Sequence, residues 1–263
     1  MNIVHPDAKI GNNVEIGPFT TIANDVVIGD GTWIASNVTI VAGSRIGKNC
    51  KVFSGAIIGA MPQDLKFHGE STLLEIEDNV TIREYCTINK GTQANYETRI
   101  CENALLMAYV HVAHDCIIGR NCILANNVNL AGHIEIGDFA ILGGLTAVHQ
   151  FVKIGEHSMV GGGSLVRKDV PPYVKAAREP LSYIGINSVG LVRRGFTKDQ
   201  INLIQDVYRI LFVLGNNTTQ ALEIIKSTIK PTKERDHILS FIGGADRGIM
   251  KGFRQLNQFT TQN

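Results

Sequence analysis

The chain has 263 residues, of which 44% are hydrophobic, so it is long enough to bury a sizeable core. Its five cysteines include no C-x-x-C pair, which argues against a disulfide framework and a cysteine-built zinc site. The start, MNIVHPDAK, has no basic segment followed by an apolar run, and no stretch approaches about 18 uninterrupted apolar residues. We therefore expect a cytoplasmic protein without an integral membrane segment.

Charge divides the chain into two parts. Residues 172–263 hold 13 of the 25 Lys+Arg and 7 of the 24 Asp+Glu, a balance of +6, which leaves 12 and 17, a balance of −5, for residues 1–171. A basic C-terminal part suits a strongly acidic partner through electrostatic steering. This part lacks a clustered basic stripe with interleaved aromatic residues, so we expect no nucleic acid partner.

From Val4 onward, aliphatic residues recur every six positions. Stepping by six from Val4 to Val166 visits 28 positions, and all except Asp64, Glu70 and Ala94 are Ile, Val or Leu. A period of six fits neither an α-helix nor a simple strand. It suits a β-solenoid whose coil has three short strands, with one aliphatic residue pointing inward on each face. We predict this architecture for residues 1–171.

Two further positions repeat together with the aliphatic residue. Glycine often follows it directly, as in Ile10-Gly11, where we expect the chain to turn a tight corner. The position four residues after the aliphatic residue is usually small, and four cysteines occupy it. We interpret these four as small buried apolar residues: Cys50, Cys86, Cys116 and Cys122.

Three segments leave the repeat. Residues 59–75 and 89–99 are polar and rich in turn formers, so we predict loops that project from the solenoid. The repeat stops near residue 171, and we predict a helical domain over residues 172–263. The helix signals there are a capping box at Thr197 and Gln200 before a helix ended by Gly215, a second helix capped by Thr218 or Thr219 and stopped by Pro231, and a third from about Lys233 to Gly243.

Four of the eight histidines fall close together in this repeat. An 18-residue coil stacks Val112, Leu130 and Val148 in one column, about 4.8 Å apart. The same register places Gly132 over His114 and His133 over Asp115. The four histidines near this column are His111, His114, His133 and His149.

The residues alone leave three interpretations of this corner open. Asp115 follows His114 directly, which suits a general base whose tautomer is fixed by a carboxylate. No Ser or Cys stands nearby in a distinctive setting, so direct transfer fits better than a covalent intermediate. The alternatives are a zinc site built from histidines of adjacent coils and a scaffold without catalytic activity.

The repeat resembles the hexapeptide-repeat family, whose members form a left-handed parallel β-helix and are typically trimers with active sites between neighbouring helices; its carbonic anhydrase branch holds zinc. The runs PQDLKFHGE, TINKGT, HVAHDC, LAGH and VRRGF occur in this order. With them, nearly the whole chain is similar to the UDP-N-acetylglucosamine O-acyltransferases that open lipid A biosynthesis. The expected fold is therefore mainly β, a left-handed parallel β-helix of hexapeptide repeats followed by a C-terminal α-helical domain.

The resemblance implies transfer of a 3-hydroxyacyl chain from acyl carrier protein to the 3-hydroxyl of UDP-N-acetylglucosamine, by a homotrimer that needs no cofactor and no metal. It makes His114 the general base, Asp115 its partner and the Gly132 N–H the oxyanion donor. It assigns sugar or phosphate contacts to Gln63, Asp64 and Lys66, the sugar and acyl pocket to His111, His133, His149 and Gln150, and the nucleotide diphosphate to Asn187, Arg193 and Arg194. Gly162 would leave the acyl groove open to a long chain.

Two variations within this family bear on the substrate. The family often has an acidic residue after Asn187 that contacts the base, whereas this chain has Ser188 and Val189. Some relatives acylate a 3-amino sugar, and the sequence does not separate this reaction from O-acylation. The related N-acyltransferase that acts later in the pathway carries an extra N-terminal domain, whereas this chain enters its repeat at Val4.

Overall fold

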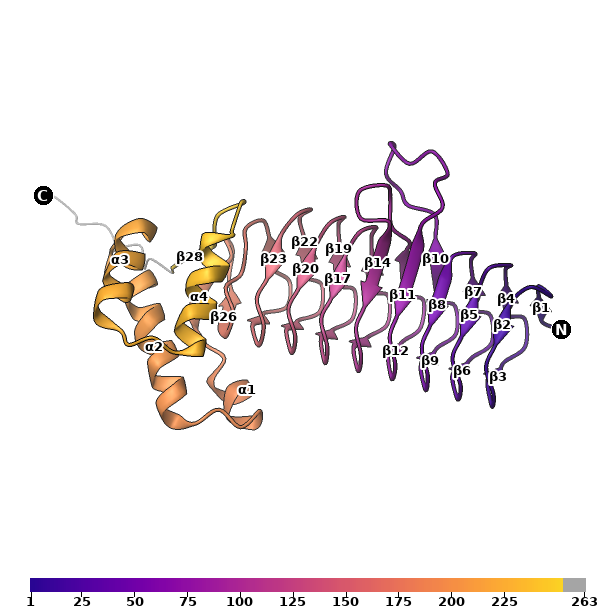
Figure 1. Ribbon diagram of the computed structural model, residues 1–263, viewed down its shortest axis with the longest axis horizontal. Helices are drawn as coiled ribbons and strands as arrows, with labels where there is room; N and C mark the ends of the chain where they lie inside the picture. Colours follow the sequence, from indigo (N-terminus) through magenta and orange to yellow (C-terminus); the bar gives the residue numbers. More distant parts are fainter. Residues whose placement is uncertain (253–263) are drawn as a thin grey trace, which may run out of the picture.

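The computed structural model describes residues 1–252. It is an elongated three-sided solenoid with the N-terminus at one end and the helices at the other (Figure 1). Each coil contributes one short strand to each of three sheets, whose strands are parallel throughout the solenoid. We call these sheets face A, face B and face C, and the turns that join them in chain order the A–B, B–C and C–A corners.

The strands of each face are as follows. Face A contains β1 (Ile3–Val4), β4 (Thr21–Ile22), β7 (Thr39–Ile40), β10 (Ile57–Ala60), β13 (Thr87–Asn89), β16 (His111–Val112), β19 (Asn129–Leu130), β22 (Ala147–Val148) and β25 (Leu165–Val166). Face B contains β2 (Lys9–Ile10), β5 (Val27–Ile28), β8 (Ser44–Ile46), β11 (Leu73–Ile76), β14 (Glu97–Ile100), β17 (Ile117–Ile118), β20 (Glu135–Ile136) and β23 (Lys153–Ile154). Face C contains β3 (Glu15–Ile16), β6 (Trp33–Ile34), β9 (Lys51–Val52), β12 (Thr81–Ile82), β15 (Leu105–Leu106), β18 (Ile123–Leu124), β21 (Ile141–Leu142), β24 (Met159–Val160), β26 (Val174–Ala177), β27 (Ser182–Ile186) and β28 (Lys251–Gly252).

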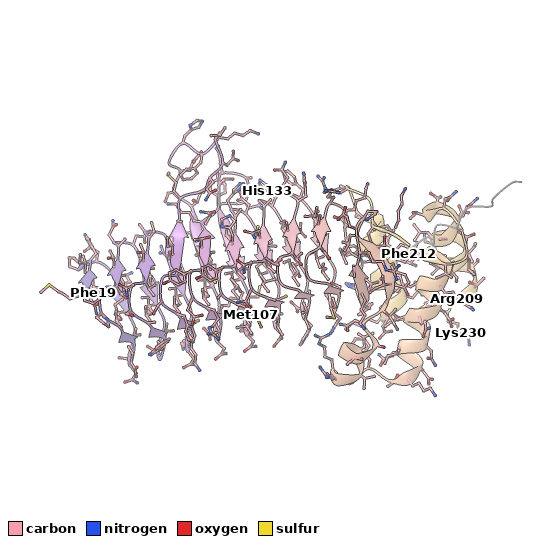
Figure 2. The ribbon with its side chains drawn as sticks, turned by 180° about the vertical axis from the view of Figure 1, so that it is seen from behind. Phe19, Met107, His133, Arg209, Phe212 and Lys230 are labelled. Atoms are coloured by element: carbon pink, nitrogen blue, oxygen red, sulfur yellow. The ribbon has the colours of Figure 1, made fainter. Side chains whose placement is uncertain are left out.

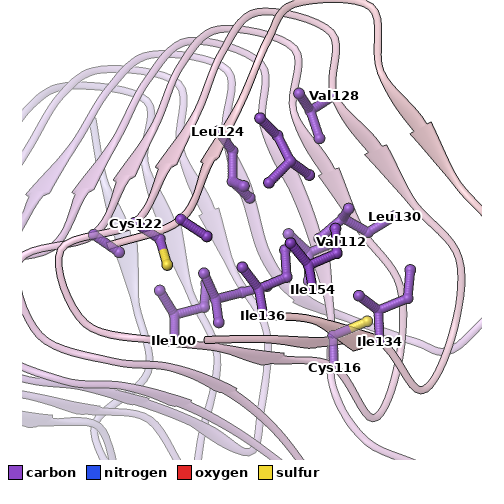
Figure 3. Close-up of a cluster of buried hydrophobic side chains, with 14 of the residues drawn as sticks. Ile100, Val112, Cys116, Cys122, Leu124, Val128, Leu130, Ile134, Ile136 and Ile154 are labelled. Atoms are coloured by element: carbon purple, nitrogen blue, oxygen red, sulfur yellow. The ribbon is translucent and has the colours of Figure 1, made fainter. Parts of the chain in front are cut away.

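The predicted columns are confirmed. Val112 pairs with Leu130, and Leu130 pairs with Val148. The inward aliphatic residues form the core, and Figure 3 shows Ile100, Ile136 and Ile154 in one row along face B. Burying each such side chain contributes about 1.5–3 kcal/mol. The four cysteines assigned to the small buried position are fully buried, as predicted.

The glycine that follows the aliphatic residue has a different role from the one predicted. Gly11 does not adopt a left-handed conformation, whereas Asn13, two residues later, has φ of 55°. A Cβ at Gly11 would lie 2.8 Å from the backbone nitrogen of Asp30 in the next coil. Glycine is therefore needed because successive coils approach closely, while the corner itself is turned mainly by asparagine and other residues that occupy the third position.

The two predicted loops leave the solenoid at the same corner. The first connects β10 to β11 and the second connects β13 to β14, so both arise at the A–B corner and project from one side (Figure 1). Successive inward residues are Ile58 and Ile76 around the first loop, and Ile88 and Ile100 around the second. These separations, 18 and 12 positions instead of six, are multiples of six, so the repeat continues in phase after each loop.

The segment after residue 172 begins with strands, where the sequence predicted helices. β26 pairs in parallel with β24, and β27 pairs with β26 in antiparallel orientation, so both extend face C. The last coil of a solenoid has unpaired backbone groups at its edge, and this hairpin satisfies them on face C. Tertiary pairing thus decides the conformation of residues 174–186.

Within residues 1–252, four helices follow the hairpin. The capping box of Thr197 and Gln200 is confirmed, and the third predicted helix has the predicted bounds. The second predicted helix is capped by Asn217, in a capping box with Gln220, instead of Thr218 or Thr219. The helices are α1 (Ser188–Arg193), α2 (Lys198–Phe212), α3 (Thr218–Thr228) and α4 (Lys233–Gly243).

Helix α2 joins the helical part to the solenoid. The Tyr208 ring stacks with Tyr183 of β27 at 5.7 Å and with Phe212 at 5.8 Å. The fully buried Tyr208 hydroxyl donates to the carbonyl of Pro172 at 2.6 Å. Within residues 1–252, no helix combines the length and the hydrophobicity needed to cross a bilayer.

Candidate functional site

The A–B corner after β16 holds His114 and Asp115. Asp115 adopts a left-handed conformation, with φ of 58°, which turns its carboxylate back toward its neighbour. Its Oδ2 lies 2.7 Å from Nδ1 of His114. The Asp115 side chain is fully buried and that of His114 is 12% exposed. The predicted pairing of the two side chains is therefore present.

The Asp115 carboxylate is held in its charged form. Its pKa is lowered to about 2, because hydrogen bonds from His114 and Thr92, together with the nearby His133, outweigh the rise that burial would cause. A carboxylate that stays ionised accepts hydrogen bonds and stabilises positive charge on the imidazole. The pair thus has the chemistry of a general base with its orienting carboxylate.

Gly132 lies against the imidazole of His114, as the 18-residue register predicted. A Cβ at Gly132 would stand 2.5 Å from Cε1 and 2.7 Å from Nε2 of His114, so the ring can keep this position only beside a glycine. The N–H groups of Asn129 and Ala131 donate to the next coil, to the carbonyls of Thr146 and Val148. Within the described residues, the Gly132 N–H is not among the donors of this ladder.

His133 lies over Asp115, also as predicted. Its Nδ1 is 3.8 Å from Oδ2 of Asp115, and its ring meets that of His114 edge to face at 5.0 Å. The other face of His133 stacks on Phe151 at 4.5 Å. Burial lowers the pKa of His133, against the opposing charge of Asp115. Figure 2 shows His133 near the base of the projecting loops, with Met107 on the opposite edge of the solenoid.

The same corner borders a cavity of about 760 Å³. Both loops contribute to its walls, with Asp64 and Lys66 from the first and Thr92 and Asn95 from the second. A cavity of this size suits a small molecule that carries several polar groups. The other lining residues are Glu70, Gln93, Ala94, Asp115, Ile117, His133, Glu135, Phe151, Lys153, Asp169, Asp246 and Arg247.

Family models match most of the chain. A model described as UDP-N-acetylglucosamine O-acyltransferase, domain 2, matches residues 169–250, and one of the bacterial transferase hexapeptide matches residues 25–60 and 97–132. An acyl-[acyl-carrier-protein]--UDP-N-acetylglucosamine O-acyltransferase of Thiobacillus denitrificans is 46% identical over 95% of this chain and 97% of its own. The chain belongs to this acyltransferase family.

Solved structures of acyltransferases agree with this assignment. The UDP-N-acetylglucosamine acyltransferase of Bacteroides fragilis is 48% identical and superposes with a TM-score of 0.94 over 95% of this chain and 98% of its own. That of Arabidopsis is 31% identical, with a TM-score of 0.85 over 95% of this chain and 98% of its own. The predicted fold, a left-handed parallel β-helix followed by helices, is confirmed.

Three other predicted residues of this acyltransferase, His111, His149 and Gln150, lie on or directly after strands of face A. His111 is on β16, and its Nδ1 is 2.8 Å from the Thr87 hydroxyl. Burial lowers the pKa of His111, which favours its neutral form. His149 follows β22 and is exposed, with Nδ1 3.2 Å from the carbonyl of Gln150. None of these three residues lines the cavity within the described part of the chain.

The residues predicted to hold the nucleotide lie at the B–C corner. Asn187 caps α1 and donates Nδ2 to the carbonyl of His157 at 2.9 Å, so it is engaged in the fold. The Arg194 guanidinium lies over the Phe139 ring at 5.2 Å, and Nη2 donates to the Phe139 carbonyl at 3.0 Å. Arg193 is exposed at the end of α1. One chain therefore does not bring these side chains to the A–B corner.

The remaining predicted residues occupy separate places. Gln63 is exposed in the first loop, where the Lys66 N–H also donates to Oδ1 of Asp64 at 3.0 Å. Gly162 lies at the C–A corner, and a Cβ there would stand 3.0 Å from the carbonyl oxygen of Gly144. The structure thus collects Asp64, Lys66, Asp115 and His133 at one cavity of a single chain and distributes the rest.

His114, Asp115 and His133 present ligand atoms within 4.8 Å of one another, the arrangement a metal site would need. Both imidazoles turn Nδ1 toward the same oxygen of Asp115. Three further hydrogen bonds reach the carboxylate, from the Thr92 hydroxyl at 2.6 Å and from the N–H groups of Thr92 and Asn95 at 3.0 and 3.2 Å. This geometry is that of a hydrogen-bonded base, and family membership favours an acyltransferase over the alternative of a zinc site built from histidines of adjacent coils.

Sequence reasoning missed Thr92 and Asn95. The only sequence signal for them is that residues 89–99 leave the six-residue repeat, which marks the second loop as an insertion. Nothing in the repeat relates position 92 to position 115, because the path of the loop depends on its own turn geometry.

Proposed function

We propose that this acyltransferase moves a 3-hydroxyacyl chain from acyl carrier protein to the 3-hydroxyl of UDP-N-acetylglucosamine, the first step of lipid A biosynthesis. The observation that carries the proposal is the pairing of His114 with Asp115, in which Nε2 of His114 lies beside Gly132 and Asp115 lines a large cavity. The names of the relatives supply the two substrates.

The chemistry follows from the position of each group. His114 takes the proton of the sugar hydroxyl at Nε2, and the carboxylate of Asp115 stabilises the resulting imidazolium. The sugar oxygen attacks the thioester carbonyl and forms a tetrahedral oxyanion, to which the Gly132 N–H donates a hydrogen bond. Collapse of this intermediate forms the ester and breaks the C–S bond, and the leaving thiolate takes the proton back from the imidazolium.

We further propose that the enzyme is a homotrimer whose sites are completed by neighbouring copies. Outward side chains of face C form an apolar column in which Leu105 pairs with Ile123, Ile141 with Ile123, and Met159 with Ile141. These side chains are half-buried or exposed, and an accessible apolar strip of this kind suits contact with another copy. The B–C and C–A corners of a neighbour would then supply the predicted nucleotide residues and the predicted chain-length residue, which one chain keeps away from its own cavity.

The donor and the location belong to the same proposal. Acyl carrier protein is strongly acidic, and the balance of +6 in residues 172–263 would steer it to the helical end. The proposal also places the enzyme in the cytoplasm.

The test is a transfer assay with purified protein, 3-hydroxyacyl carrier protein and a panel of acceptors. The proposal predicts a product whose mass equals UDP-N-acetylglucosamine plus one 3-hydroxyacyl group, joined by an ester that mild alkali cleaves. A product formed only with the 3-amino sugar, and stable to the same alkali as an amide, would assign the chain to N-acylation. Absence of any acyl transfer by the folded protein would contradict the proposal.

A further inference from the structure

The second loop returns to the site and holds Asp115 through three donors. The N–H groups of Thr92 and Asn95 donate to Oδ1 at 3.0 and 3.2 Å. The Thr92 hydroxyl lies 2.6 Å from Oδ2, the same oxygen that His114 contacts. Thr92 is 8% exposed and Asp115 is 1% exposed, so this contact is shielded from water. Among residues 1–252, the hydrogen bonds to Oδ2 come from Thr92 of the loop and from His114.

The direction of these hydrogen bonds follows from their neighbours. The N–H of Ala94 donates to the Thr92 hydroxyl oxygen at 3.3 Å, which leaves the hydroxyl hydrogen for Oδ2 of Asp115. The ionised carboxylate can only accept. The hydrogen between Asp115 and His114 must therefore be carried by Nδ1 of His114, which leaves the lone pair on Nε2, beside Gly132.

The backbone of Asp115 is fixed by the strand that follows the loop. Its N–H donates to the Thr98 hydroxyl at 2.8 Å, and Thr98 lies on β14, where the loop ends. The Asn95 side chain also donates to the Asp115 carbonyl at 3.5 Å. One six-residue insertion thus contacts both the backbone and the carboxylate of Asp115, which a simple turn in the repeat would not do.

We propose that Thr92 is a positioning residue for this acyltransferase. Its hydroxyl and N–H hold Asp115 as an acceptor-only carboxylate in one orientation, and thereby keep His114 in the tautomer whose Nε2 removes the proton from the sugar hydroxyl. The inference rests on the proposed function for its kinetic consequence, while the tautomer itself is a property of the protein alone.

The titratable groups that act on the pair or on its neighbour include His133 of the next coil and Asp64 and Lys66 of the first loop. His133 faces Oδ2 of Asp115 with Nδ1 at 3.8 Å. Asp64 and Lys66 of the first loop act on His133 with opposite signs, the carboxylate raising and the ammonium lowering its pKa. Thr92 itself is neutral, so its removal changes hydrogen bonding without adding or removing charge. Any change in pH dependence can then be traced to the carboxylate and its two histidines.

The experiment compares Thr92→Val, which removes the hydroxyl and keeps the shape, with Thr92→Ser, which keeps the hydroxyl. Thr39→Val, on an exposed part of face A, is the matched control. Loss of a hydrogen bond to a charged group predicts that the Val variant loses about 10- to 100-fold in kcat with KM changed less than about twofold. Thr92→Ser should recover most of the rate, and Thr39→Val should match the natural enzyme.

The pH profile of kcat/KM and the NMR spectrum of His114 should change if Thr92 sets the tautomer of His114. They should not change if Thr92 only holds the loop in place. With one donor fewer, the carboxylate attracts the imidazolium proton more strongly, so the acid limb of kcat/KM should move to higher pH in Thr92→Val. The proton on Nδ1 of His114 should give a downfield resonance in the natural protein and in Thr92→Ser, and this resonance should shift or broaden in Thr92→Val.

Three results would overturn the inference. They are a Val variant with kcat within threefold of the natural enzyme, equal losses in the Val and Ser variants, and an unchanged Nδ1 proton resonance in Thr92→Val. If the natural protein transfers no acyl chain, the proposed function fails, and the NMR comparison still decides whether Thr92 sets the tautomer.

Discussion

Replacing Gly132 with alanine tests the packing of the base most sharply. The new Cβ would stand 2.5 Å from Cε1 and 2.7 Å from Nε2 of His114, whereas non-bonded carbon atoms prefer about 3.5–4.0 Å. The atoms in its way belong to the end of a side chain, so the imidazole moves and the coil stays in place. A displacement of about 1 Å breaks the 2.7 Å contact with Asp115 and moves Nε2 away from the substrate.

The expected loss follows from this displacement. A misplacement of about 1 Å costs on the order of 100-fold in rate, so kcat of Gly132→Ala should fall by about that factor, while overpacking costs about 1–3 kcal/mol of stability. The assay is steady-state acyl transfer, with circular dichroism to confirm folding. The control is Gly243→Ala at the end of α4, where a Cβ would meet no atom within 4 Å. A folded Gly132→Ala enzyme with kcat within threefold of the natural one would refute the reasoning.

Four other predictions use different parts of the molecule. Gly162→Met should shift the preferred donor from long to short acyl chains in a competition assay; an unchanged preference for long chains would refute the role of Gly162. Tyr208→Phe leaves the Pro172 carbonyl without its 2.6 Å hydrogen bond and should lower the free energy of unfolding by about 1–3 kcal/mol in denaturant titration, with Tyr183→Phe in the same ring stack as the comparison. The fold lowers the pKa of Asp115 from 3.8 to about 2, so the ionised carboxylate stabilises the folded protein above about pH 4. The natural protein should therefore exceed Asp115→Asn by about 2 kcal/mol in free energy of unfolding above pH 4, and this difference should disappear as the pH falls from 4 to 2. Ile123→Glu should convert the proposed trimer to monomers in sedimentation velocity and abolish transfer; a trimer of the variant would exclude face C as the interface.

The fixed period explains why so much of the site could be predicted. In a solenoid with 18 residues per coil, an offset of 18 in sequence becomes an axial contact in space, so the contacts of Gly132 with His114 and of His133 with Asp115 follow from counting. The role of the repeated glycines was predicted wrongly, because they are required by the close approach of adjacent coils. That approach is a property of the assembled solenoid and cannot be inferred from a single turn.

The rest of the site depends on segments outside the repeat. Thr92 reaches Asp115 through a loop whose path follows from its own hydrogen bonds, such as that from the Tyr96 N–H to the Thr92 carbonyl at 2.7 Å. Asn187 and Arg194 are placed by the hairpin and by α1, which face the B–C corner. Their motifs predict what these side chains can bind, whereas the corner they occupy is decided by tertiary pairing. Likewise, Asn217 and Thr218 are both good caps, and a one-residue difference in the start of α3 selects between them.

The central claim is that His114 is the general base of acyl transfer, and the most direct measurement is kcat of His114→Ala beside the natural enzyme under saturating substrates. General-base catalysis contributes about 10²- to 10⁴-fold. A general base at His114 predicts a loss of that size in a variant that keeps the fold and the oligomeric state of the natural protein. A His114→Ala enzyme within tenfold of the natural rate would contradict it.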